Sequence, residues 1–137
     1  MFRFHFFLIA ALGLSVLSIG CGDKAKEDIA SQLAAAEAAA RKTPTAEAYV
    51  DLSLRYFQAQ NYPACLTAAA EAIKIKPDNS VAYNNQAACY GAMSKWDEEI
   101  AAAQQALRLS PDFQLAKNNL AWAESQKKAA GSKATPK

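Results

Sequence analysis

Apolar side chains recur at helical spacing through the middle of the chain. Tyr49, Leu52 and Tyr56 stand at positions i, i+3 and i+7, which places them on one face of a helix. A second apolar run with similar spacing follows residues 60–63 (QNYP), whose composition is typical of a turn. Its members are Leu66, Ala69, Ala72 and Ile73. The pattern predicts two consecutive helices joined by a short turn.

The same arrangement returns 34 residues later. Shifting the sequence by 34 positions aligns residues 46–79 with residues 80–113. The identical pairs include Tyr49 with Tyr83, Tyr56 with Tyr90, Ala69 with Ala103, Ala72 with Ala106, and Pro77 with Pro111. Small residues let two helix backbones approach closely, and rings fill the volume that remains. We therefore expect two helix pairs of one architecture.

Turn-forming residues mark the ends of the expected helices. Asn61 and Ser94 favour a turn within each pair. Pro63 and Asp97 suit the first turn of the helix that follows, because proline lacks a donor that is not needed there and a carboxylate faces the positive helix end. The proline near the end of each unit stops the second helix.

Three segments flank the repeats. Residues 114–128 keep the phase of a first helix, but Lys117 and Glu124 replace the aromatic residues, as a solvent-facing terminal helix requires. Residues 24–45 are rich in helix formers and form either a capping helix on the first repeat or a partly frayed spacer. Their thin apolar stripe consists of Ile29, Leu33, Ala36 and Ala40. Residues 129–137 lack a large apolar side chain, and we expect them to be disordered.

The positions shared by the two units follow a known helical pattern. Each unit has an aromatic residue at positions 4 and 11, alanine at positions 24 and 27, and proline at position 32. In these positions the chain resembles the tetratricopeptide repeat (TPR) family, although Gln86 and Glu99 stand where the family has leucine and alanine. The resemblance implies an all-α fold, a short TPR solenoid of antiparallel helix pairs. Residues 46–79 would be TPR 1, residues 80–113 TPR 2 and residues 114–128 a C-terminal capping helix.

An almost continuous apolar run, residues 4–19, stands at the N-terminus behind Arg3. A positive start, a short apolar stretch and small residues at its end are typical of an export signal. A membrane-spanning helix needs about 20 apolar residues, and this run is shorter. An uncleaved anchor helix is the alternative.

The end of that run has a distinctive composition. Leu17, Ser18, Ile19 and Gly20 stand immediately before Cys21. This arrangement resembles the bacterial lipobox, although Ser18 holds the place that leucine usually takes. The resemblance implies that residues 1–20 are a lipoprotein signal peptide and that Cys21 carries a lipid such as palmitate. Residues 21–45 would then be the lipidated cysteine and a helical spacer. The protein would be exported and lipid-anchored to the bacterial cell envelope, and Gly22 is compatible with the outer membrane. An ordinary signal peptide with an incidental cysteine is the alternative.

Composition argues against several functional classes. The 15 basic and 13 acidic residues are scattered, so no stripe exists to neutralise nucleic-acid phosphates. The only histidine is His5, and the three cysteines form no C-x-x-C pair, so we expect no metal site. Without a mature histidine or a glycine-rich phosphate loop, we expect neither an enzyme nor a cofactor.

In the TPR family the stacked first helices form a concave groove that holds an extended peptide or a partner helix. The resemblance places seven residues of this chain in such a groove: Val50, Leu54, Phe57, Asn84, Ala88, Asn118 and Trp122. Asn84 and Asn118 would bind a peptide backbone, while Phe57 and Trp122 would anchor side chains. Alternatively, the C-terminal segment covers Trp122.

Two further residues, Asn85 and Asn119, and two of the seven, Val50 and Leu54, refine this expectation. Asn85 and Asn119 fall at the next position along, where we expect hydrogen bonds between repeats. Val50 and Leu54 stand where chaperone-tail clamps of this family use charged and amide side chains, so a less charged ligand is expected.

The other two cysteines form an even pair in a chain expected to be exported. Cys65 begins one second helix and Cys89 lies late in the adjacent first helix. They form either a disulfide or two small buried thiols.

Together these features predict a membrane-anchored module for protein–protein interaction, with a protein or peptide as its partner. Two and a half repeats bury a limited core, and solenoids usually need about three units for stability. The alternative is therefore a structural subunit of an envelope assembly, or a homo-oligomer, with no exchangeable ligand.

Overall fold

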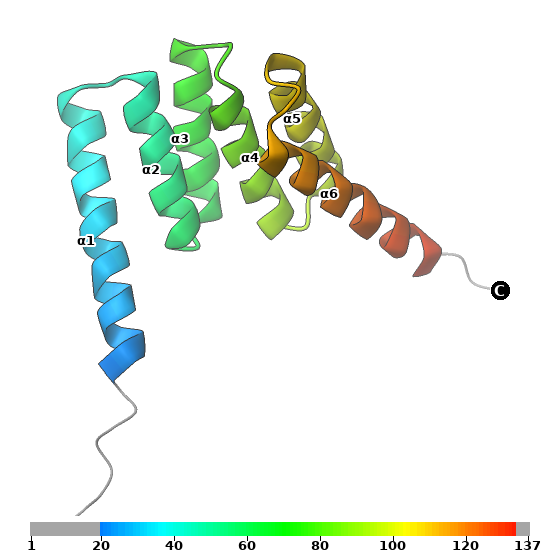
Figure 1. Ribbon diagram of the computed structural model, residues 1–137. Coiled ribbons are helices and arrows are strands. Elements are labelled where there is room, and N and C mark those ends of the chain that lie inside the picture. The colour runs from blue at the N-terminus through cyan, green and yellow to red at the C-terminus, as the bar shows by residue number, and fades with distance from the viewer. Residues whose placement is uncertain (1–19, 134–137) are drawn as a thin grey trace, which may run out of the picture.

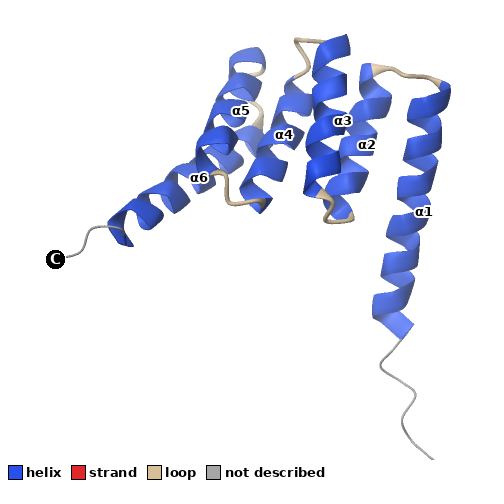
Figure 2. Cartoon of the chain, turned by 180° about the vertical axis from the view of Figure 1, so that it is seen from behind, coloured by secondary structure: helices blue, strands red, loops and turns tan. Residues whose placement is uncertain are grey.

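The computed structural model describes residues 20–133, and the side chains of residues 24–132. All regular secondary structure in this part of the chain is helical, without a strand, and short loops join the helices (Figure 2). The six helices are α1 (Gly20–Lys42), α2 (Ala46–Gln58), α3 (Tyr62–Ile75), α4 (Ser80–Ala92), α5 (Trp96–Leu109) and α6 (Gln114–Lys133). The predicted all-α class is confirmed.

The helices stand in a row that follows their order in the sequence (Figure 1). Each helix packs against the next, and the first helices of successive pairs also touch, α2 with α4 and α4 with α6. This consecutive packing is solenoid-like, with α1 and α6 at the two ends of the row. None of the described helices combines the length and apolarity needed to cross a bilayer.

Small residues dominate the interior. Leu52 is the only large aliphatic residue among the described ones that is buried, whereas thirteen of the sixteen buried hydrophobic residues are alanines. Partly buried rings close the spaces between the helices: Tyr49 and Tyr56 pack on one buried cluster and Tyr90 on the other. Alanine lets the helix axes approach, and the rings restore the packing density.

The turns within the two helix pairs have the same backbone shape. Gln60 and Ser94 are left-handed, each with a φ of 58°. Asn61 then caps α3, because its side chain accepts a hydrogen bond from the backbone N–H of Ala64 at 3.3 Å. The equivalent residue before α5, Lys95, makes no such bond.

The C-terminal half of α1 packs on α2. Ala36 and Ala40 are 4% and 3% exposed and share a cluster with Leu52. Tyr56 Oη donates a hydrogen bond of 2.8 Å to Glu37 Oε1, and this bond raises the pKa of Tyr56. The sequence left two alternatives for residues 24–45, a capping helix on the first repeat or a partly frayed spacer. The C-terminal half of α1, which makes these contacts, is a capping helix.

The ends of the chain differ from the expectation in one respect. Helix α6 runs to Lys133, so residues 129–133, predicted to be disordered, are helical. Alanine and lysine are strong helix formers and can prolong a helix without burying a side chain. Residues 134–137, the apolar run of residues 4–19 and the side chain of Cys21 lie outside what is described.

Candidate binding groove

A cavity lies between the first helices of the row. It measures about 280 Å³ and receives side chains from α2, α4 and α6. Its seven lining residues are Leu54, Phe57, Asn84, Asn85, Ala88, Leu115 and Asn119. The cavity therefore joins both helix pairs and the terminal helix.

Four of the seven predicted groove residues line this cavity: Leu54, Phe57, Asn84 and Ala88. The other three do not. Val50 uses its backbone carbonyl to accept a hydrogen bond from Asn85. Asn118 is exposed and accepts a hydrogen bond from Gln114 Nε2 at 2.9 Å. Trp122 is 57% exposed among the residues whose side chains are described, which do not include residues 133–137 of the C-terminal segment.

Leu115, Asn85 and Asn119 complete the lining; register places Leu115 at a groove position, and the two asparagines were predicted to bond between repeats and not to bind a ligand. Leu115 is the second residue of α6 and lies about one turn before Asn118. Its apolar side chain at the helix start was the available signal, since it repeats the place of Val81 in α4.

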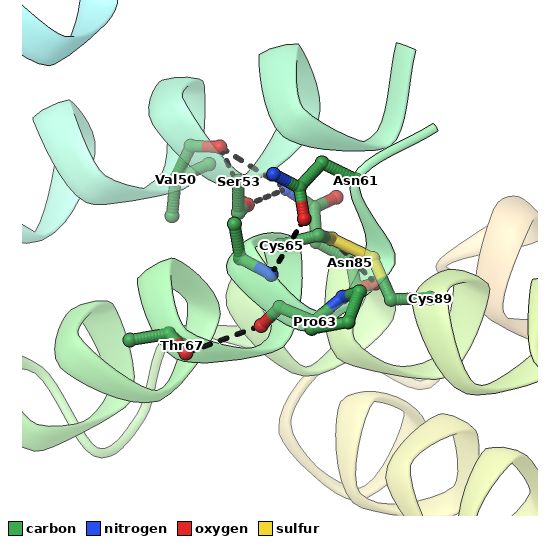
Figure 3. The surroundings of a disulfide bond; sticks show 9 residues. Val50, Ser53, Asn61, Pro63, Cys65, Thr67, Asn85 and Cys89 are labelled. Carbon is green, nitrogen blue, oxygen red and sulfur yellow. Dashed lines mark hydrogen bonds between the residues drawn. A yellow bond between two sulfur atoms is a disulfide. The ribbon is translucent and has the colours of Figure 1, made fainter. Parts of the chain in front are cut away.

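Two asparagines tie the first helices together. Asn85 Nδ2 on α4 donates to Val50 O at 3.2 Å and to Ser53 Oγ at 2.7 Å, both on α2 (Figure 3). Asn119 Nδ2 on α6 donates to Asn84 Oδ1 on α4 at 3.0 Å. The prediction that Asn85 and Asn119 bond between repeats is confirmed. Because these bonds cross the helix interfaces, they fix the spacing of the helices that form the cavity.

Large apolar side chains stay exposed on all three helices that line the cavity, and two of them, Leu54 and Leu115, also line it and form its rim. Leu54, Leu115 and Trp122 are 40%, 59% and 57% exposed. Val81, which precedes the cavity on α4, is 43% exposed. Large apolar side chains that remain in water on one face are a feature of interaction surfaces.

A disulfide bond joins the two helix pairs beside the groove. It links Cys65 of α3 to Cys89 of α4, whose Cα atoms are 6.4 Å apart (Figure 3). Both residues are fully buried. Of the two alternatives left open by the sequence, the structure has the disulfide and not a pair of free thiols.

One buried carboxyl group lies outside the groove. Glu99 of α5 is 2% exposed, and its Oε2 atom has no hydrogen-bond partner. Burial raises the pKa of Glu99 to about 7. Its position is one where the sequence departs from the TPR pattern. Within the described residues, no three histidine, cysteine or acidic side chains gather as a metal site would require.

No protein-family model matches the sequence, and no curated protein matches it. The case for a function therefore depends on the cavity, its rim and the sequence pattern.

Proposed function

We propose that this protein is a TPR-type lipoprotein of the bacterial envelope that binds a protein or peptide partner in the groove between α2, α4 and α6. The lipid on Cys21 would hold the domain at a membrane, and the groove would hold the partner. In this proposal the protein is an interaction module and not an enzyme.

The observation that carries the proposal is the cavity with its apolar rim. Monomeric proteins seldom leave several large apolar side chains in water on one face unless something binds there. Leu54, Leu115 and Trp122 lie on helices that hydrogen bonds hold at fixed spacing. A preformed surface of this kind lowers the ordering cost of binding.

The disulfide supports export. Disulfides persist in oxidising compartments, including the space outside the bacterial inner membrane, and are rare in the cytosol. Cys65 and Cys89 therefore agree with the signal-like segment that precedes Cys21. Metabolic labelling with palmitate tests the anchor: the wild-type chain should carry the label, and Cys21→Ser should not.

Site-specific photocrosslinking in cells tests the groove. A photoreactive phenylalanine at Leu54, on the rim, should give crosslinks to other proteins. The same group at Ala70, an exposed position on α3, is the matched control and should give few. Equal crosslinking from both positions, or none from Leu54, would contradict the proposal.

The same experiment separates an adaptor from a structural subunit. Crosslinked partners that vary with growth conditions favour an exchangeable ligand. One partner at constant stoichiometry, or a second copy of this chain, favours a permanent assembly.

A further inference from the structure

A second hollow lies between α4 and α5, and it is separate from the groove. It measures about 530 Å³, and its lining shares no residue with the cavity between α2, α4 and α6. Helix α4 contributes Tyr83, Gln86 and Tyr90, and α5 contributes Glu98, Gln105 and Arg108 together with two alanines. Sites for small ligands usually measure about 300–1,000 Å³. This α4–α5 hollow therefore has the size of a ligand site.

The first helix pair shows what lies on the equivalent face. The three α4 residues of the hollow repeat Tyr49, Leu52 and Tyr56 of α2 after 34 positions. On the first pair this face is occupied, because Ala36 and Ala40 of α1 cluster with Leu52 and the two rings pack against that cluster. Among the described residues, only those of α4 and α5 line the hollow. The face that α1 covers on the first pair is therefore open on the second.

Gln86 makes this open face polar. It stands where the TPR pattern has leucine and where the first pair has the buried Leu52. Within residues 20–133 the Gln86 amide makes no hydrogen bond. Compared with leucine, the amide gives up apolar contact and offers an acceptor and two donors. An occupant of the hollow gains from Gln86 only if it carries polar groups, unlike the alanines of α1.

The tyrosine hydroxyls of the hollow are also unused by the protein. On the first pair, Tyr56 Oη donates a hydrogen bond of 2.8 Å to Glu37 of α1. The equivalent Tyr90 and its neighbour Tyr83 have no hydrogen-bond partner in the described part of the chain. The bond to Glu37 shows that a tyrosine at this position binds an acceptor oxygen of the group that lies over it, so the hollow suits a ligand with such oxygens.

The charges at the edge of the hollow balance. Glu98 and Arg108 contribute one charge of each sign, and both residues are exposed. Arg108 donates from Nε and Nη2 to Gln105 Oε1, which leaves its Nη1 and the amide nitrogen of Gln105 as donors. A strongly charged ligand of either sign would meet a like charge as well as an opposite one. A neutral ligand that both donates and accepts can bond to the whole edge.

These properties fit a carbohydrate. Each hydroxyl of a sugar both donates and accepts, and two neighbouring hydroxyls lie close enough to bond to one amide or carboxylate. The C–H groups on the faces of a sugar ring are apolar and pack on aromatic rings, whose hydroxyls still reach polar groups. A peptide carries one N–H and one C=O per residue, spread along an extended chain, and so matches fewer of these side chains at once.

We propose that the α4–α5 hollow binds a sugar unit of a neutral glycan. The sugar ring packs on Tyr83 and Tyr90, and its hydroxyl groups form hydrogen bonds with Gln86 and with the charged side chains at the edge. This second site goes beyond the function proposed for the groove and does not depend on it.

Calorimetric titration of the full chain in lipid nanodiscs tests the site, with empty nanodiscs as the blank. The probes are cellotetraose, chitotetraose and a blocked peptide of glycine, serine and threonine. The two sugars share a backbone and differ in an acetamido group, so their relative affinities show whether hydroxyls alone are recognised. At least one sugar should bind with a millimolar or tighter Kd, and the peptide should not bind.

A matched pair of variants tests the amide. Gln86→Leu places in the second pair the residue that the first pair has at the equivalent position, so the chain should stay folded. It removes the hydrogen bonds of the amide to the sugar and should weaken binding about tenfold. Gln104→Leu makes the same change at an exposed position of α5 outside the hollow and should leave the Kd unchanged. Thermal melts of both variants report whether they remain folded.

A second pair of variants tests the hydroxyl. Tyr90→Phe keeps the ring and removes one hydrogen bond to the sugar, so it should weaken binding about fivefold. Tyr56→Phe makes the same change on the first pair, where it breaks the bond to Glu37, and should leave the sugar affinity as it is.

The proposal is overturned if neither sugar binds, or if Gln86→Leu and Gln104→Leu change the sugar affinity equally. Binding of the peptide but of neither sugar, lost in Gln86→Leu, would identify the occupant as a polypeptide and would also overturn it. These outcomes are distinct from failure of the groove. Crosslinking from Leu54 is measured separately and should be the same in Gln86→Leu as in the wild-type chain.

Discussion

The buried carboxyl of Glu99 lies directly against Gly91, with no room between α5 and α4 for another carbon atom. A Cβ built on Gly91 would lie 2.6 Å from Glu99 Oε2 and 2.7 Å from its Cδ. The corresponding residues 34 positions earlier are Cys65 and Phe57. The first pair thus combines a small residue on the second helix with a large one on the first helix, and the second pair reverses the sizes.

This reversal predicts that the effect of Gly91→Ala on the free energy of unfolding depends on which residue stands at position 99. In the wild-type chain the new methyl group must displace Glu99, which is 2% exposed and has little space to move, so Gly91→Ala should destabilise the fold. In the Glu99→Ala background the same change should stabilise it by about 1 kcal/mol, because alanine exceeds glycine in helix propensity. Urea unfolding of the four chains measures the coupling, and additive effects would refute it.

Glu99 also predicts a pH dependence of stability. Burial raises the pKa of its carboxyl from 4.5 to about 7 in the folded state. Between these values the folded chain holds a proton that the unfolded chain has released, so this group's contribution to stability falls as pH rises through the window. The loss is complete above pH 7 and amounts to roughly 3 kcal/mol. Helix α4 has no acidic or basic residue to offset the buried charge, and Asp97 on α5 is paired with Lys127.

Glu99→Gln isolates this contribution, because the amide has nearly the same shape and does not titrate. The variant should match the wild type in free energy of unfolding near pH 4 and exceed it at pH 8. Glu98→Gln changes an exposed neighbour and should leave the pH profile as it is. A constant difference between Glu99→Gln and the wild type at all pH values would show that Glu99 is not the titrating group.

The fold follows from local patterns that a sequence displays directly. Helical spacing of Tyr49, Leu52 and Tyr56, repeated after 34 residues, predicts the helix pairs. The finer features depend on which atoms meet across helices. Asn84 and Asn85 are adjacent and chemically identical, yet Asn85 bonds to α2 and Asn84 keeps a free donor. Position within the repeat predicts that Asn85 bonds between repeats, but it does not reveal that Asn84 accepts the bond from Asn119.

Residue type alone does not predict the burial of Glu99, although the repeat places it where the family has alanine. Acidic residues on helices usually face water, and an expectation based on residue type places Glu99 on an outward face. Its burial requires the space left by Gly91 on another helix, and that compensation involves two positions at once.

The two turns differ in their caps, and the difference predicts a stabilising substitution. Asn61 caps α3 with its side chain, whereas Lys95 leaves the first N–H groups of α5 without a side-chain partner. Lys95→Asn should stabilise the chain by about 1 kcal/mol, and Asn61→Ala should cost about as much. Denaturant unfolding measures both. The control is Lys128→Asn, which makes the same change on the exposed surface of α6, away from a helix cap, and should not raise the free energy of unfolding. An equal increase from Lys128→Asn would show that loss of the positive charge, and not capping, stabilises the chain.

The disulfide predicts how stability responds to reduction. Cys65 and Cys89 are 24 residues apart in sequence, and closing a loop of that length stabilises a fold by about 3 kcal/mol in the chain-entropy account. Reduction of the unfolded chain before refolding should therefore lower the free energy of unfolding by about that amount, and the double variant Cys65→Ala and Cys89→Ala should show a similar loss. Because both sulfurs are fully buried, reductant added to the native protein should act slowly. The double variant serves as its own control, since its stability should not change with reductant. Thiol labelling that is complete in the denatured, unreduced wild-type chain would show that the bond does not form.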